Sequence, residues 1–251
     1  MARTRWYAAG MDDLSSILGL AAAFGLDQAQ SASLTRYADL ILAWQGGNVT
    51  ALRSAEDVMR TLLGDSLALL AVPALQARSS TTWLDLGAGA GVPGIPLAVA
   101  MPEARLTLLD AAVKKCAFLE EAVAAAGLAG RAGVVCARSE RFGASGQQGR
   151  EAFAVVLARA VAPLPTLLEL AAPLLAVGGV LLASKTGKAL AAEGPGGDVA
   201  AQQCGLAARP PVPLPRSPLD DAVCAVFEKV GPTRGRLPRR EGVAAKRPLG
   251  A

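Results

Sequence analysis

The sequence predicts a doubly wound α/β fold, in which a mainly parallel seven-stranded sheet carries helices on both faces and follows an N-terminal helical extension. From residue 81 onward, short apolar runs typical of buried strands alternate with longer helical stretches, an order that favours parallel strands joined by crossover helices. A glycine-rich loop at residues 87–94 separates the first of these strands from a helix. At 251 residues and 52% hydrophobic content, the chain is long enough for one such domain with extensions.

Residues 1–75 are expected to form the helical extension. Apolar side chains recur with helical spacing between Leu34 and Trp44, and residues 56–70 form a second helical stretch. The two glycines at 46–47 predict a loop between these helices.

An earlier apolar stretch, at residues 14–26, has the length of a secretory signal core. However, Asp12 and Asp13 stand where a signal peptide would carry positive charge. The stretch is also too short to span a bilayer as a helix. It therefore predicts an amphipathic helix, and the chain is expected to be a cytoplasmic monomer with no membrane segment.

Residues 76–230 are expected to form the sheet domain. Strands are predicted at 81–86, 105–109, 133–136, 153–157, 180–184, 212–214 and 222–230, and helices at 93–101, 112–126 and 167–175. The glycine-rich stretch at 187–197 is expected to be a mobile loop. Parallel strands end at a common edge of the sheet, where ligands bind. The residues that follow predicted strands are therefore expected to share that edge: Asp85, Gly87, Asp110, Glu140, Arg159 and Lys185.

The glycine-rich loop fits two cofactor patterns. Gly89, Gly91 and Gly94 have the G-x-G-x-x-G spacing of dinucleotide-binding proteins, which predicts a nicotinamide-dependent oxidoreductase. Counted from Asp85, the same loop reads D-x-G-x-G-x-G, the form typical of proteins that bind S-adenosylmethionine (SAM). A helix N-terminus attracts a pyrophosphate, whereas SAM carries a sulfonium cation, so the carboxylate of Asp85 favours SAM. Asp110, about 20 residues on, suits both cofactors because a carboxylate there binds ribose hydroxyls.

The composition excludes several kinds of catalytic site. The chain has no histidine, which excludes Ser-His-Asp and Cys-His catalysis and histidine-bound metals. Its four cysteines lie far apart without a C-x-x-C pair, so neither a metal site nor a disulfide framework is expected. Cys116 follows Lys114 and Lys115, whose charges predict a lowered pKa for its thiol.

Positive charge is concentrated near the C-terminus. Residues 231–251 carry six basic side chains against Glu241, whereas the whole chain has a formal net charge of only +4. Such a segment is typical of an arm that binds a polyanion. The basic residues of this expected arm are Arg234, Arg236, Arg239, Arg240, Lys246 and Arg247.

Six further segments form a recognisable set: Asn-Val-Thr at 48–50, Asp-Ser-Leu at 65–67, the loop and Pro-Gly-Ile-Pro-Leu run at 85–97, residues 108–119, Arg-Ala-Val-Ala-Pro-Leu at 159–164, and Pro-Arg-Arg-Glu-Gly at 238–242. Together they resemble a known family, the bacterial ribosomal RNA small-subunit methyltransferase G family. The run at 93–97 and the C-terminal motif are more specific than the glycine loop. The resemblance covers nearly the whole chain.

The resemblance implies a class I SAM-dependent methyltransferase with a Rossmann-like fold, which methylates N7 of a guanosine in the 530 loop of 16S rRNA. Its partner would be 16S rRNA or an assembling small subunit. Asp110 would bind the ribose hydroxyls of SAM, and Ser139 and Glu140 would lie beside the adenine. Lys185 and the basic arm would contact RNA phosphates. The implied cofactor residues are Gly87, Val92, Asp110, Ala111, Ala112, Ser139, Glu140 and Arg159.

Four positions depart from the family's usual residues. Leu62, or Thr61, stands where the family has a histidine, Val92 replaces phenylalanine or leucine, Ser139 replaces alanine, and Ala154 replaces aspartate. The missing histidine agrees with the implied chemistry: guanine N7 has a free lone pair and no proton, so methyl transfer needs alignment and no general base. We therefore expect no catalytic acid or base. A further alternative, motivated by the basic arm and by the altered positions 62 and 92, is an RNA-binding assembly protein that has lost catalysis.

Overall fold

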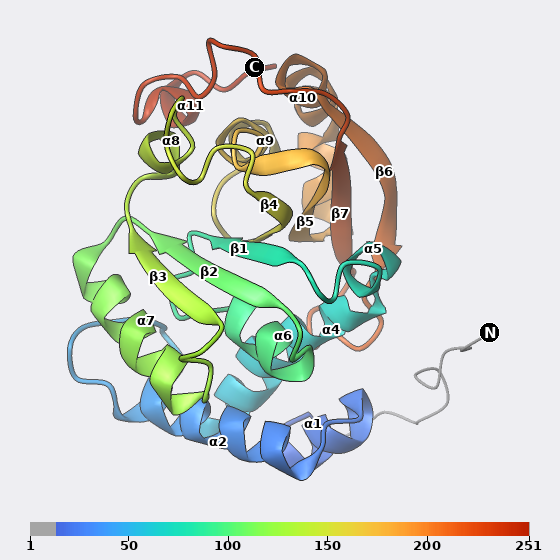
Figure 1. Ribbon diagram of the computed structural model, residues 1–251. Coiled ribbons are helices and arrows are strands. Elements are labelled where there is room, and N and C mark those ends of the chain that lie inside the picture. Colours follow the sequence, from blue (N-terminus) through green and yellow to red (C-terminus); the bar gives the residue numbers. More distant parts are fainter. Residues whose placement is uncertain (1–13, 251) are drawn as a thin grey trace.

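The computed structural model of the protein describes residues 14–250, so residues 1–13 of the expected extension and residue 251 lie outside the described part. One seven-stranded sheet, with strand order β3-β2-β1-β4-β5-β7-β6, forms its centre (Figure 1). The strands are β1 (Thr82–Leu86), β2 (Arg105–Asp110), β3 (Ala132–Cys136), β4 (Phe153–Arg159), β5 (Leu175–Thr186), β6 (Leu206–Pro213) and β7 (Ala222–Lys229). The first five pair in parallel, and β7 is antiparallel to β5 and β6. The predicted seven-stranded, mainly parallel sheet is confirmed.

The helices are α1 (Ile17–Phe24), α2 (Gln28–Ala43), α3 (Ala55–Asp57), α4 (Asp65–Ala68), α5 (Pro73–Gln76), α6 (Gly94–Ala100), α7 (Val113–Ala125), α8 (Ser139–Phe142), α9 (Leu164–Ala171), α10 (Gly187–Cys204) and α11 (Val243–Lys246). A π-helical segment, η1 (Val58–Gly64), joins α3 to α4, and a 3-10 turn, η2 (Leu69–Ala71), follows α4. None of the helices between residues 14 and 250 is both long and apolar enough to cross a membrane.

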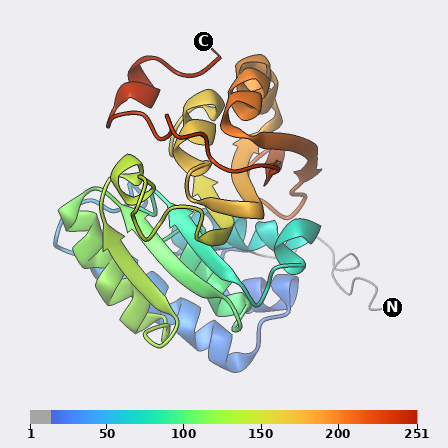
Figure 2. The same cartoon turned by 45° about the horizontal axis from the view of Figure 1, so that its top comes forward.

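Helices cover both faces of the sheet, which is the doubly wound arrangement (Figures 1 and 2). Successive strand residues point to opposite faces. Trp83 of β1 faces a core shared with α1, α2, α6 and α7, whereas Leu84 faces a second core shared with α9 and α10. The N-terminal helices thus complete one face of the sheet together with α6 and α7.

The predicted mobile loop at residues 187–197 is wrong, because this stretch is the first part of the helix α10. The Thr186 side chain caps the helix by accepting a hydrogen bond from the backbone N–H of Ala189 (3.1 Å). The glycines that suggested a loop allow close packing instead: a Cβ on Gly197 would lie 2.6 Å from a methyl of Leu164 in α9. Glycine here permits two helices to approach, an effect of tertiary packing that overrides local helix propensity.

The chain leaves β1 toward β2 and β3, then returns to place β4 on the other side of β1. In doubly wound sheets, a crevice forms at the carboxyl ends of the strands where the order reverses. The switch point of this sheet therefore lies between β1 and β4, beside Leu86 at the end of β1 and its partner Ala158 in β4.

Candidate cofactor site at the carboxyl edge of the sheet

The glycine loop turns sharply at the end of β1, as the sequence predicted. The N–H groups of Gly87 and Ala88 both donate to the carbonyl of Leu109 in β2, at 2.8 and 3.0 Å. Gly87, Gly89 and Gly91 have φ angles of 67°, 57° and 86°, in the left-handed region that favours glycine. The loop therefore depends on glycine at these three positions and is fixed to the end of β2.

Asp110 ends β2 and supports this loop. One of its carboxylate oxygens accepts a hydrogen bond from the N–H of Gly89 (3.0 Å), and the other from the N–H of Ala112 (2.9 Å). The Lys115 ammonium lies 3.9 Å from the same carboxylate. A carboxylate has about four acceptor positions, so each oxygen retains one for a further donor. Ala111 and Ala112 are exposed beside it.

Substituting Asp110 with asparagine is expected to weaken SAM binding by about tenfold to a hundredfold, because charge-assisted hydrogen bonds of roughly 1.5 to 3 kcal/mol are lost. Asparagine keeps the shape of the side chain but has only one acceptor oxygen, so one of the hydrogen bonds from Gly89 and Ala112 is lost and the melting temperature is also expected to fall. Isothermal titration with SAM measures the effect. An unchanged affinity would show that Asp110 does not bind the cofactor.

Asp85 lies beneath the glycine loop and is completely buried. One carboxylate oxygen accepts a hydrogen bond from the N–H of Gly94 at 2.8 Å, and the other has no partner within the described residues. Burial raises the pKa of the Asp85 carboxyl to about 7, against the opposing effects of the Gly94 N–H and the Arg159 charge. A buried acid without a full set of partners is an observation that fits a cationic ligand in the adjacent loop.

The helical extension reaches the same loop. The Tyr37 hydroxyl of α2 donates a hydrogen bond to the carbonyl of Ala90. Farther back along α2, the Gln30 amide donates to the carbonyl of Val99, near the end of α6 (3.1 Å). Helix α2 therefore runs toward the carboxyl edge of the sheet, and the loop after it extends beyond the glycine loop.

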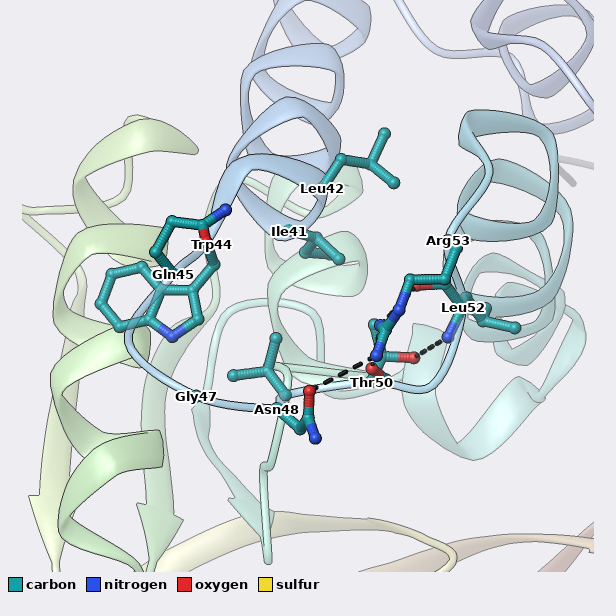
Figure 3. A pocket seen from close by; sticks show the side chains of 10 residues that line it. Ile41, Leu42, Trp44, Gln45, Gly47, Asn48, Thr50, Leu52 and Arg53 are labelled. Carbon is teal, nitrogen blue, oxygen red and sulfur yellow. Dashed lines mark hydrogen bonds between the residues drawn. The ribbon is translucent and has the colours of Figure 1, made fainter.

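The end of α2 and that loop border an open cavity of about 270 Å³, lined by ten residues between Ile41 and Arg53 (Figure 3). Arg53 donates to the carbonyl of Thr50 at 2.8 Å and to the side-chain oxygen of Asn48 at 3.4 Å. The Trp44 ring packs edge-on against Phe118 of α7, with centroids 5.3 Å apart. The sequence predicted a loop here, but not Arg53 or a cavity.

Ser139 and Glu140 begin α8, immediately after β3. The Ser139 hydroxyl donates to one carboxylate oxygen of Glu140 at 3.2 Å, and the N–H of Gly242 donates to the other at 3.0 Å. The carbonyl of Asp110 accepts from the N–H of Ala137 at 3.0 Å, so α8 follows closely beside Asp110. Four predicted residues therefore lie at one edge of the sheet, as expected: Gly87, Asp110, Ser139 and Glu140. The hydrogen bond from Gly242 to Glu140 was not expected from the sequence.

Arg159 ends β4 and is held by the helical extension. Its Nε lies 3.0 Å from the buried carboxylate of Asp65, and its Nη2 donates to the carbonyl of Thr61 at 2.8 Å. The Nη1 atom is buried and has no partner in the described part of the chain. The pair with Asp65 was not predicted from the sequence, although an acid within the apolar stretch at 56–70 was the available signal.

Lys185 and Val92 lie at different places on the edge. The Lys185 ammonium is 2.8 Å from the Glu193 carboxylate of α10 and donates to the carbonyl of Ala162 at 3.1 Å. The Lys185 side chain, which was expected to contact RNA, is thus already engaged in an ion pair.

Val92 is half-buried at the end of the glycine loop, packed against the core that α6 and α7 share.

The expected C-terminal arm packs against the domain instead of extending from it (Figure 1). Leu237 and Ala244 are buried, and the Thr166 hydroxyl of α9 donates to the carbonyl of Ala244 at 3.1 Å. Arg239 binds both carboxylate oxygens of Glu169, itself 1% exposed. Arg239 is therefore a structural residue, whereas the remaining basic residues of the segment are exposed: Arg234, Arg236, Arg240, Lys246 and Arg247.

The thiol of Cys116 also differs from the prediction. Cys116 lies on the buried face of α7, and burial raises its pKa to about 12 in spite of the neighbouring lysines. Lys114 is exposed and Lys115 half-buried, directed toward Asp110. The expected lowering of the pKa is therefore wrong.

The doubly wound seven-stranded sheet and its glycine loop define a Rossmann-like α/β fold. The putative sarcosine dimethylglycine methyltransferase from Galdieria sulphuraria has a similar structure, with a TM-score of 0.53, 14% identity, and coverage of 79% of this chain and 98% of that one. The structure of M. jannaschii TYW2 in complex with AdoMet gives a TM-score of 0.51 at 15% identity, over 67% of this chain and 77% of that one. At such low identity the likeness shows the fold alone.

The sequence comparison is more specific. The family described as rRNA small subunit methyltransferase G matches residues 30–205. The protein called Ribosomal RNA small subunit methyltransferase G in Deinococcus radiodurans is 43% identical over 204 residues, covering 80% of this chain and 78% of that protein. The protein of the same name in Roseiflexus castenholzii is 36% identical over 248 residues, with coverage of 94% and 100%. The chain belongs to the rRNA small subunit methyltransferase G family, as its motifs indicated.

Proposed function

We propose that this protein transfers a methyl group from SAM to N7 of a guanosine in the 530 loop of 16S rRNA, in the cytoplasm. Family membership supports the ribosomal substrate, because the relatives carry the name Ribosomal RNA small subunit methyltransferase G. The observation that carries the choice of cofactor is the buried Asp85 carboxylate beneath the glycine loop. It favours a sulfonium cation over a pyrophosphate.

The proposed cofactor contacts follow the edge of the sheet. The remaining acceptor positions of Asp110 would take the ribose hydroxyls, and Ser139 with Glu140 would border the adenine. Gly87 and Val92 would line the side of the SAM site that the glycine loop forms. SAM would supply the methyl group on its sulfonium, and these residues would fix the direction in which that methyl points.

The reaction needs positioning and no proton transfer by the protein. Guanine N7 already carries a lone pair, so the protein only has to hold it in line with the methyl group and the leaving sulfur. The absence of histidine from the whole chain is compatible with this requirement. Orientation of the two substrates and exclusion of water would account for the rate.

The nicotinamide-dependent alternative is less compatible with the geometry. In the dinucleotide pattern, the N–H groups at the start of the helix would face a pyrophosphate. Here the N–H of Gly94 is bound to the Asp85 carboxylate at 2.8 Å, and a Cβ on Gly94 would lie 2.7 Å from the same oxygen. Calorimetric titration with SAM and with NAD separates the two alternatives, and binding of SAM alone is expected.

Transfer of tritium from methyl-labelled SAM to 16S rRNA tests the proposed activity. Naked rRNA and small-subunit particles should both be tried as acceptors, and the product analysed for N7-methylguanosine. Label at N7 of a guanosine in the 530 loop is expected. Binding of SAM and rRNA without transfer would instead support the assembly protein that has lost catalysis, and label at another position would contradict the N7 assignment.

Exposed arginines of the C-terminal segment are proposed to contact RNA phosphates. Combined substitution of Arg234, Arg236 and Arg240 with alanine is expected to weaken RNA binding and reduce its salt dependence, because each lost phosphate contact lowers the slope of log K against log salt by about 0.7 to 0.9. SAM affinity should not change. The matched control is Arg105→Ala, which removes an exposed arginine at the start of β2, the opposite edge of the sheet. An unchanged slope in the triple variant would contradict the RNA contact.

A further inference from the structure

A buried acid of the helical extension meets the end of β4. Asp65, in α4, is only 2% exposed and lies 3.0 Å from the Nε of Arg159. The Ser217 hydroxyl, from the segment between β6 and β7, donates a hydrogen bond to the other oxygen of the Asp65 carboxylate. The Asp65 carboxylate therefore links three segments that are distant in sequence.

This arrangement leaves part of the guanidinium free. Nη2 donates a hydrogen bond to the carbonyl of Thr61 at 2.8 Å, and Nε forms an ion pair with an Asp65 oxygen at 3.0 Å that lacks hydrogen-bond geometry, whereas Nη1 is buried without a hydrogen-bond partner in the described residues. A guanidinium is a rigid plane, so the hydrogen bond at Nη2 and the ion pair at Nε together fix the direction of Nη1. A buried, unpaired donor is costly and calls for an acceptor that is not part of the described chain.

The position of Arg159 indicates what that acceptor is. Arg159 is the last residue of β4, next to β1 at the switch point of the sheet. Val161, two residues after Arg159, packs beside the glycine loop, where a Cβ on Gly87 would lie 3.1 Å from one of its methyl groups. A group bound there beside the glycine loop would belong to the cofactor, and the part of SAM with oxygen acceptors and negative charge is its amino-acid carboxylate.

We propose that Asp65 is a positioning residue, which holds Arg159 so that its free Nη1 donors bind the carboxylate of the cofactor. The inference rests on the proposed SAM-dependent function and goes beyond it, because it gives the helical extension a direct part in cofactor recognition. Ser217 acts through Asp65, because its hydroxyl donates to the Asp65 carboxylate and so orients it. Without Asp65, Arg159 regains rotational freedom that is lost again whenever the cofactor binds.

Two cofactor analogues distinguish this role from simple structural support. S-adenosylhomocysteine keeps the amino-acid carboxylate, whereas 5′-methylthioadenosine keeps the adenosine and lacks the amino-acid part. Titration of Asp65→Asn is expected to show about tenfold weaker binding of S-adenosylhomocysteine, and unchanged binding of 5′-methylthioadenosine. If Asp65 only supported the fold, both ligands would be weakened alike, and that result would overturn the proposal. Unchanged binding of both would overturn it as well.

Matched variants complete the test. Glu228→Gln removes the carboxylate of another arginine pair, with Arg209 on the outer strands, and should leave both ligands unaffected. In an Arg159→Gln background, Asp65→Asn should cause no further loss, since it acts only through Arg159. If Asp65→Asn does not fold, Ser217→Ala provides the same comparison with a smaller effect. A wild-type protein that binds neither SAM nor 5′-methylthioadenosine would contradict the proposed function itself, and the inference with it.

Discussion

Replacing Gly87 with valine is expected to abolish SAM binding while the protein remains folded. Gly87 has a φ of 67°, a conformation that a β-branched residue adopts only at a cost of roughly 1 to 3 kcal/mol. A Cβ at this position would also lie 3.1 Å from a methyl of Val161, so the side chain would displace the loop or fill the space beside it. Domain stabilities are about 5 to 15 kcal/mol, which leaves most of the population folded.

Calorimetric titration with SAM, together with a thermal melt, measures both parts of this expectation. Gly133→Val is the matched control, because Gly133 lies in β3, where a Cβ would meet no heavy atom within 4 Å, and valine favours strands. The control should bind SAM normally. Retained binding in Gly87→Val would show that the cofactor does not occupy the glycine loop.

The second large effect concerns pH and the buried Asp85. Because its pKa is raised from 3.8 to about 7, the folded protein keeps this proton at pH values where the unfolded chain has lost it. Unfolding releases the proton between these limits, so the contribution to stability is fully present below about pH 4 and is lost as the pH rises through about 7. At 1.36 kcal/mol for each pKa unit, the loss amounts to about 4 kcal/mol.

Denaturant unfolding of the wild type and Asp85→Asn between pH 5 and 8 tests this expectation. The asparagine variant should become more stable relative to wild type as the pH rises, because it has no carboxyl to ionise. Parallel pH profiles would contradict the raised pKa. SAM should also bind the wild type more tightly as the pH rises toward 8, since a bound sulfonium favours the ionised carboxylate, and the asparagine variant should lose this trend.

The sheet and the glycine loop were predictable because their signals are local. Runs such as residues 81–86 and 153–157 are strand-like in composition, and three glycines close together require an unusual turn. Asp110 followed from its place after the second strand. Local patterns of this kind indicate the strands, the fold class and the edge where ligands bind, but not the strand order or the partners of each side chain.

What the sequence did not reveal depends on contacts between distant segments. The pair of Asp65 with Arg159 spans the helical extension and β4, and only the assembled fold shows it. The C-terminal segment was interpreted as an arm because its positive charges are concentrated there. Its packing against the domain depends on the buried Leu237 and on the ion pair between Arg239 and Glu169, which the sequence does not show. Similarly, the lysines before Cys116 are visible in the sequence, but the burial that decides its pKa is not.

The most direct test of the proposed function is to map N7-methylguanosine in 16S rRNA from cells with and without the gene for this protein. Chemical cleavage at N7-methylated guanosines gives the position of each modification. We expect one modified guanosine in the 530 loop that disappears when the gene is deleted, and returns with the wild-type gene but not with the Gly87→Val variant. An identical methylation pattern in both strains would contradict the proposed function.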